Sequence, residues 1–246
     1  MKVKTILISQ PEPNTEHSPY ADLIQKHNVK IDFIPFIHVD GVESREVRQQ
    51  KIDLSQFTSI ILTSRNAVDH FFRIAEEMRY TIPNTLKYFC QSEAVAFYLQ
   101  KYVVYRKRKI YVARRTFQDL MEIIKKHDTE KFLLPSSDVL KPIVSEGLNE
   151  LGVNWKRGIF YKTVVSDLSH LENVFYDILV FFSPSGIKSL YENFPNYQQN
   201  NTRIAVFGNT TLSAAKEMGL RIDIQAPTPK TPSMTKALED YIKKNN

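Results

Sequence analysis

The chain has 246 residues, of which 42% are hydrophobic and 24% charged, and this composition is typical of one large globular domain or two small ones. Its single cysteine, Cys90, excludes an intramolecular disulfide and a cysteine-rich zinc site, and no apolar run approaches the ~20 residues of a membrane-spanning helix. The strand pattern begins almost at Met1 and leaves no room for a signal peptide, so we expect a cytoplasmic protein. The formal net charge of +6 suits an anionic partner, either a small molecule or a nucleic acid.

Short apolar runs alternate with amphipathic segments along the whole chain, which is the pattern of parallel strands joined by helices. The predicted order repeats: a strand–loop–helix–strand unit and two strand–turn–helix units each occur twice, which indicates an internal duplication. The predicted elements are strands 4–8, 31–36, 60–62, 87–90, 131–134, 158–161, 179–182 and 203–208, and helices 20–27, 94–100, 143–151, 212–218 and 233–242.

Two phrases carry the clearest functional signal, Thr63-Ser64-Arg65-Asn66 and Phe182-Ser183-Pro184-Ser185. Each follows an apolar strand and places a serine where the next helix starts, so each serine is a predicted helix cap. Ligands of open α/β sheets bind at the carboxyl ends of the strands, beside helix N-termini. Capping alone is the simpler alternative for these serines.

The other predicted strand ends are also rich in hydroxyl and amide groups and poor in carboxylates: Ser9-Gln10, Gln91-Ser92, Ser136-Ser137-Asp138 and Asn209-Thr210-Thr211. Backbone amides at helix starts, with hydroxyl donors beside them, suit carboxylates or phosphates. Arg65 and Lys141 add positive charge, so the sequence predicts a site for a polyanion.

Several motifs of catalysis and cofactor binding do not occur. The six histidines show no metal-ligand spacing, no glycine-rich phosphate loop occurs, and no GxSxG elbow marks a nucleophilic serine. We therefore expect neither a metal nor a cofactor. A basic run, Arg106-Lys107-Arg108-Lys109, followed by Arg114-Arg115, is either a nucleic-acid patch or a solvated loop, and the second interpretation is favoured because the run is short.

At these strand ends the chain resembles the uroporphyrinogen-III synthase family, and the likeness extends over nearly its whole length. The matching phrases, in the family's order and spacing, are Thr63-Ser64-Arg65-Asn66-Ala67-Val68, Phe132-Leu133-Leu134-Pro135-Ser136, Phe160-Tyr161-Lys162-Thr163, Phe181-Phe182-Ser183-Pro184-Ser185-Gly186, Phe207-Gly208-Asn209-Thr210-Thr211 and Ala226-Pro227-Thr228-Pro229. The chain departs from the family pattern at Gln10, where arginine is frequent, at 90–95, and at Leu212.

The resemblance implies two α/β lobes, each with a parallel sheet flanked by helices, joined by a two-stranded β linker. The first lobe would combine 1–36 with 165–246, the second would span 40–157, and the linker strands would be 32–39 and 158–165. The active site would lie in the cleft between the lobes, and the protein would be a monomer.

The resemblance also implies a reaction. The family converts hydroxymethylbilane, a linear tetrapyrrole with eight carboxylates, into uroporphyrinogen III by losing water, closing the ring and inverting the last pyrrole, with no cofactor. Tyr161 is the expected catalytic residue, as donor to the departing hydroxyl, although packing of the linker is the alternative role. The expected substrate-binding residues are Ser64, Arg65, Asn66, Gln91, Ser92, Ser136, Ser137, Lys141, Ser183, Ser185, Gly186, Thr210 and Thr211.

Two other functions stay open from the sequence. One is a non-catalytic tetrapyrrole- or anion-binding module on the same fold, which the departures at Gln10 and 90–95 motivate. The other is a nucleic-acid-binding protein that uses the basic residues from Arg106 to Arg115. The main prediction excludes both nucleic acid and membrane as partners.

Overall fold

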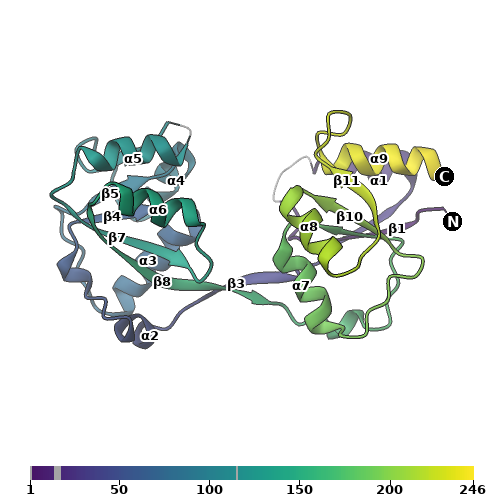
Figure 1. Cartoon of the computed structure of the whole chain (residues 1–246), viewed down its shortest axis with the longest axis horizontal. Coiled ribbons are helices and arrows are strands. Elements are labelled where there is room, and N and C mark those ends of the chain that lie inside the picture. Colours follow the sequence, from purple (N-terminus) through teal and green to yellow (C-terminus); the bar gives the residue numbers. More distant parts are fainter. Residues whose placement is uncertain (1, 14–17, 115) are drawn as a thin grey trace. The chain divides into compact units, whose positions relative to one another are not determined.

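A computed structural model describes residues 2–13, 18–114 and 116–246. The chain forms two compact units, and Figure 1 shows that each contains a sheet with helices around it. Unit 1 combines Met1–His38 with Val164–Asn246, and unit 2 is Val39–Thr163. Among the described residues, none of the helices has the length and apolar character needed to cross a membrane.

The sheet of unit 1 has five strands in the order β11-β10-β9-β1-β2, and every neighbouring pair is parallel. The N-terminal strand therefore lies between a strand that follows it closely and one from the second half of the chain. The strands are β1 (Thr5–Ile8), β2 (Lys30–Phe33), β9 (Ile178–Phe181), β10 (Arg203–Phe207) and β11 (Ile222–Ala226).

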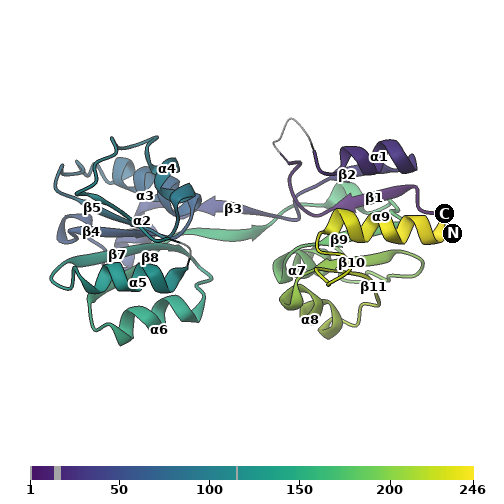
Figure 2. The same ribbon diagram turned by 90° about the horizontal axis from the view of Figure 1, so that it is seen from above.

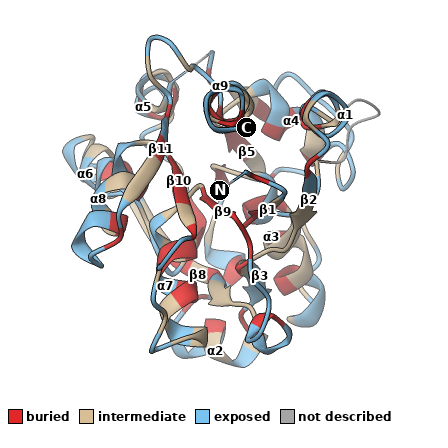
Figure 3. Ribbon diagram, turned by 90° about the vertical axis from the view of Figure 1, so that its right-hand side faces the viewer, coloured by how far each residue is buried: buried red, intermediate tan, exposed pale blue. Residues whose placement is uncertain are grey.

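Helices cover both faces of this sheet, which explains why its strands are apolar runs and do not alternate with polar residues. Ile6 and Ile8 of β1 pack into one core with Leu238, whereas Leu7 packs into the opposite core with Leu190. Figure 3 shows the resulting run of buried positions along β9 and β10. The helices are α1 (Ala21–His27) and α9 (Met234–Asn245) on the first face and α7 (Pro184–Asn193) and α8 (Asn209–Glu217) on the second.

The sheet of unit 2 has six strands in the order β3-β8-β7-β4-β5-β6. Apart from β3, unit 2 has the same strand arrangement as unit 1, since the order β8-β7-β4-β5-β6 corresponds to β2-β1-β9-β10-β11. β7 and β8 thus take the places that β1 and β2 have in unit 1. The strands are β3 (Ile37–Gly41), β4 (Ser59–Leu62), β5 (Lys87–Cys90), β6 (Ile110–Val112), β7 (Lys131–Ser137) and β8 (Asn154–Val165).

Unit 2 is also a three-layer arrangement. Ile60 and Leu62 face a core that includes Phe71, while Ile61, between them, faces a core that includes Leu148. Figure 2 shows α3 and α4 on one face of the sheet and α5 and α6 on the other. The helices are α2 (Ser44–Gln49), α3 (Arg65–Glu77), α4 (Glu93–Leu99), α5 (Phe117–Lys125) and α6 (Pro142–Glu150).

The predicted fold class, two α/β lobes with parallel sheets flanked by helices, is confirmed. The boundaries between the units fall within β3 and β8, which are neighbours in one sheet and form the two chain connections. Arg115 of the predicted basic stretch and Met1 lie outside the described residues.

Two local expectations were wrong. The predicted strand 31–36 is shorter, because β2 ends at Phe33 and the next strand, β3, begins at Ile37. The segment from Pro135 was predicted as a loop, but β7 continues through Ser137 and pairs with β8. The pairing of β7 with β4 ends at Leu133, so Pro135 lies where β7 has a partner on one side only. Proline is tolerated at such edge positions because no ladder hydrogen bond is lost there.

Asp177, directly before β9, ties the N-terminal strand to the rest of unit 1. Its Oδ2 accepts hydrogen bonds from the backbone N–H of Lys4 at 2.8 Å and of Thr5 at 3.0 Å, across 173 and 172 positions of sequence. Its Oδ1 lies 3.8 Å from the guanidinium of Arg203 at the start of β10. One buried carboxylate thus joins β1, β9 and β10.

We expect Asp177→Ala to lower the free energy of unfolding by about 2–4 kcal/mol, because it leaves the backbone N–H groups of Lys4 and Thr5 without their acceptor and removes the carboxylate that faces the largely buried guanidinium of Arg203. Urea denaturation followed by circular dichroism measures the change. Asp240→Ala, which removes an exposed carboxylate paired with Lys236 at 2.8 Å, is the control and should change stability by under about 1 kcal/mol. Equal losses in the two variants would contradict this role of Asp177.

Candidate functional site

Serine side chains cap the helices that follow two strand ends of unit 2, as predicted for Ser64. The hydroxyl oxygen of Ser64 accepts the N–H of Ala67 at 3.1 Å, and that of Ser92 accepts the N–H of Val95 at 3.4 Å. Both serines have extended backbone, which lets the side chain reach back to the first turn of its helix. Each cap leaves serine half-buried at the carboxyl edge of the sheet.

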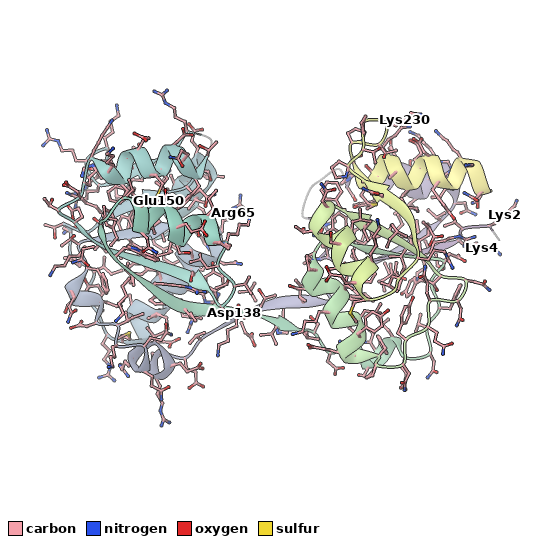
Figure 4. All side chains as sticks on the ribbon, in the orientation of Figure 1. Lys2, Lys4, Arg65, Asp138, Glu150 and Lys230 are labelled. Carbon is pink, nitrogen blue, oxygen red and sulfur yellow. The ribbon has the colours of Figure 1, made fainter. Side chains whose placement is uncertain are left out.

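Arg65 and Asn66 form the exposed first turn of α3, next to this edge (Figure 4). The guanidinium carbon of Arg65 lies 5.5 Å from the ring centroid of Tyr98, within cation–π range. Gln91, at the end of β5, is half-buried. The edge thus offers one cation and two side-chain amides beside the helix starts.

Tyr161 of β8 reaches the same edge. Its hydroxyl lies 3.2 Å from the hydroxyl oxygen of Ser64, at hydrogen-bond distance, and 7% of the residue is exposed. Its ring stacks on His70 of α3, with centroids 5.0 Å apart and planes at 18°. Ser137 pairs with Tyr161 in the sheet register. The structure therefore brings together Ser64, Ser137 and Tyr161 from three separate elements.

Burial raises the pKa of Tyr161 above its ordinary value of 10.0, and hydrogen bonds from Ser64 and the Ser137 backbone oppose this only in part. The phenol therefore carries its proton throughout the neutral range. A protonated phenol at the end of a strand can donate a hydrogen bond or a proton to a ligand oxygen.

His70 was not singled out from the sequence. Its Nδ1 accepts a hydrogen bond from Nε of Arg73 at 3.2 Å. Burial, followed by the charge of Arg73, lowers the pKa of His70 below 6.5, so the ring is neutral at pH 7 and provides a flat face for Tyr161. No motif marks this residue, because its role comes from stacking against a strand 91 positions later.

Arg157 was also missed. Its guanidinium donates to the Ser136 hydroxyl at 2.9 Å and to the backbone carbonyls of Ser137 and Asp138, each at 2.7 Å. The segment that ends β7 is thereby held against β8. Ser136 is buried and its hydroxyl is engaged within the protein, whereas the hydroxyl of Ser137 donates to the carbonyl of Val139 at 2.6 Å.

Lys141 occupies the residue before α6 and is exposed, with Pro142 at the first helical position. No ion pair involves Lys141 among the described residues, and no side chain caps this helix. Its ammonium group is therefore available to an anion near the start of α6.

Unit 1 has its own carboxyl edge. The Ser183 hydroxyl accepts the N–H of Gly186 at 3.2 Å and caps α7. A Cβ at Gly186 would lie 3.6 Å from the Ser183 hydroxyl and 3.7 Å from that of Ser9, so the glycine sits where the two strand ends approach each other. Ser185 is half-buried in the first turn of the helix.

The start of α8 differs because it has no side-chain cap. Gly208 precedes the helix with φ of 86°, a conformation that favours glycine. Thr210 is exposed in the first turn, whereas Thr211 is buried and its hydroxyl has no hydrogen-bond partner. Uncapped N–H groups at a helix start favour an anion. The predicted residues thus form two groups, one on each unit.

Comparison with known proteins gives consistent matches. The family described as "Uroporphyrinogen-III synthase HemD" matches residues 18–236. A uroporphyrinogen-III synthase of Chlorobaculum parvum is 25% identical over 257 residues, which cover 98% of this chain and all of that protein. Two crystal structures share the fold. The uroporphyrinogen-III synthetase of Helicobacter pylori has a TM-score of 0.61 at 19% identity and covers 98% of this chain and 99% of its own. A mutant uroporphyrinogen III synthase of Thermus thermophilus has a TM-score of 0.56 at 14% identity, and the match covers 98% of this chain and 100% of that one.

The lowered pKa of His70 predicts a pH dependence of stability. Between the folded pKa and 6.5 the unfolded chain binds more protons at His70, so the free energy of unfolding falls as the pH is lowered through that window. Urea denaturation at about pH 7.5 and 5.5 should show a smaller fall for His70→Gln than for the wild type. Burial also lowers the pKa of His127. Because His127 is present in both proteins, its contribution cancels in the comparison. An identical fall in both would show that His70 titrates normally.

Proposed function

The chain belongs to the uroporphyrinogen-III synthase family, and we propose that it carries out the family's ring closure with Tyr161 as proton donor and the two carboxyl edges as the substrate-binding surface. The observation that carries the proposal is the family match over residues 18–236, which includes all of the predicted site residues. The enzyme is accordingly a cyclising lyase of tetrapyrrole biosynthesis.

The chemistry sets the demands on the site. Hydroxymethylbilane closes without any enzyme, but that route joins the two ends directly and yields the type I isomer. Formation of the type III isomer requires attack by the substituted carbon of the last pyrrole, followed by inversion of that ring through a spiro intermediate. The protein must therefore hold a flexible chain in one geometry, which is a problem of orientation and not of strong activation.

Tyr161 fits the step in which water leaves. The C–O bond of the hydroxymethyl group breaks while the phenol donates its proton to the departing oxygen, and water is released. The phenolate regains a proton after the attacking pyrrole loses its own. The raised pKa supports this role because it keeps the donor protonated, and Ser64 holds the hydroxyl at the strand edge.

The eight carboxylates of the substrate would be held by charge-assisted hydrogen bonds. Arg65 and Lys141 are exposed cations at helix starts, and α8 begins without a side-chain cap. Each such bond contributes about 1.5–3 kcal/mol, so several together immobilise a flexible ligand. The buried hydroxyl of Ser136 instead suits a positioning role, through Arg157.

We propose further that residues 1–36 with 165–246 form one lobe of the enzyme and that residues 40–157 form the other. Cytoplasmic location and a monomeric state stay predictions. Gel filtration with light scattering tests the second of these.

The first experiment supplies freshly made hydroxymethylbilane to the purified protein, oxidises the product and separates the porphyrin isomers. We expect type III in clear excess over a control without protein. Only type I, formed at the spontaneous rate, would contradict the proposal and would favour a module that binds the tetrapyrrole without converting it.

Tyr161→Phe should lower the rate of type III formation by about tenfold or more, because it removes a proton donor whose contribution is typically ~10²–10⁴-fold and water loss here is comparatively easy. The ring and its stacking on His70 are retained, so stability serves as the control. A loss of less than about threefold would contradict the role as an acid.

Lys141→Gln should raise KM about three- to tenfold with little change in kcat, because it removes a charge that binds the substrate uniformly. Lys131→Gln is the matched control, since Lys131 is exposed at the opposite end of β7. The same KM increase in both variants would show that net charge, and not position, is responsible.

A further inference from the structure

A groove in unit 2 lies away from the predicted substrate residues. Its volume is about 340 Å³, and Tyr88 and Ile110, which pair at the starts of β5 and β6, form its floor. Gln91 and Ser92 follow the opposite end of β5. The groove therefore belongs to the amino edge of the sheet, and its function would be independent of the reaction proposed above.

One wall of the groove is aromatic and held in place. Tyr102 stacks on Phe72 with centroids 4.3 Å apart and planes at 5°, and Phe72 stacks on Tyr88 at 6.3 Å and 25°. The Tyr102 hydroxyl donates to Oδ1 of Asp69 at 2.6 Å, so the ring is fixed from two sides. This wall is thus preformed for a flat apolar group.

The wall is nevertheless open to solvent. Tyr102 is 41% exposed, and Val104, which also lines the groove, is 80% exposed. Phe72 covers part of Tyr102, and the Lys101 ammonium lies 5.7 Å from the centroid of its ring. The remaining surface of Tyr102 and that of Val104 is apolar surface that a ligand could remove from water.

Two cations of the basic run complete the lining. Arg106 and Lys109 both line the groove, and the turn between them is closed by the N–H of Lys109, which donates to the carbonyl of Arg106 at 2.9 Å. Neither side chain takes part in an ion pair among the described residues, and no carboxylate is among the described residues that line the groove. Lys107 and Arg108, between them, are exposed and do not line it.

We propose that this groove binds a small organic anion, whose apolar body lies against Tyr102 and Val104 and whose carboxylate, sulfonate or phosphate group lies between Arg106 and Lys109. The volume is near the lower end of the roughly 300–1,000 Å³ of small-molecule sites, which suits a body of one or two fused rings. Charge complementarity selects the anion, because the lining holds two unpaired cations beside apolar surface.

The probe for this proposal is 8-anilinonaphthalene-1-sulfonate, an aromatic anion that fluoresces when its body leaves water. Titrated into the full-length protein, it should bind saturably at one site and be displaced by 2-naphthoate. Arg106→Gln/Lys109→Gln should weaken binding about tenfold, whereas Lys107→Gln/Arg108→Gln, with the same change of net charge in the same turn, should stay within twofold. N-phenyl-1-naphthylamine, the same body without the sulfonate, should bind both variants alike.

Each other outcome overturns the proposal. Equal weakening in the two double variants would mean that the charge acts from a distance. No weakening in either would place the probe elsewhere on the protein. Loss of the neutral probe from the Arg106→Gln/Lys109→Gln variant, with unchanged stability in urea, would mean that the two cations do not act through the charge of the ligand.

Discussion

Parallel pairing is the constraint on which this architecture depends. Parallel strands need a crossover between them, and here helices provide it, so in each unit strand ends and helix starts gather along one edge. Ser64 and Tyr161, which are 97 positions apart in sequence, meet for that reason. The same geometry gives each unit a row of N–H groups and hydroxyls, which is chemistry suited to a polyanion.

The two edges of unit 2 differ in chemical character. The carboxyl edge offers hydroxyls, amides and the phenol of Tyr161, which keeps its proton because burial raises its pKa. The amino edge offers stacked rings and two cations. The groove at the amino edge thus lies on the same unit as the carboxyl edge but at the opposite ends of the strands.

The sequence predicts most of the strands along the chain, and the helix caps at Ser64 and Ser183, because both follow from local patterns. Apolar runs that end in serine specify a strand and a cap together, as at Ser64 and Ser183. It fails at Pro135, where the absence of a second neighbouring strand lets proline remain in β7. Arg157 and His70 were missed for another reason: their roles depend on contacts with residues about 20 and 91 positions away, which no local pattern encodes.

Unit 1 is built from two separate segments of the chain, and this has a consequence for the order of folding during synthesis. Unit 2 is continuous and is complete once residue 163 has emerged, so it can fold while the rest is still being made. Strand β1 leaves the ribosome before its partners, because Asp177 and the neighbouring strand β9 follow 172 positions later. At translation rates of about 5–20 residues per second, that apolar strand waits on the order of ten to thirty seconds for its partner. During that interval β1 lacks β9 and also α9, which comes later in the chain than β9 and packs over the same core as β1.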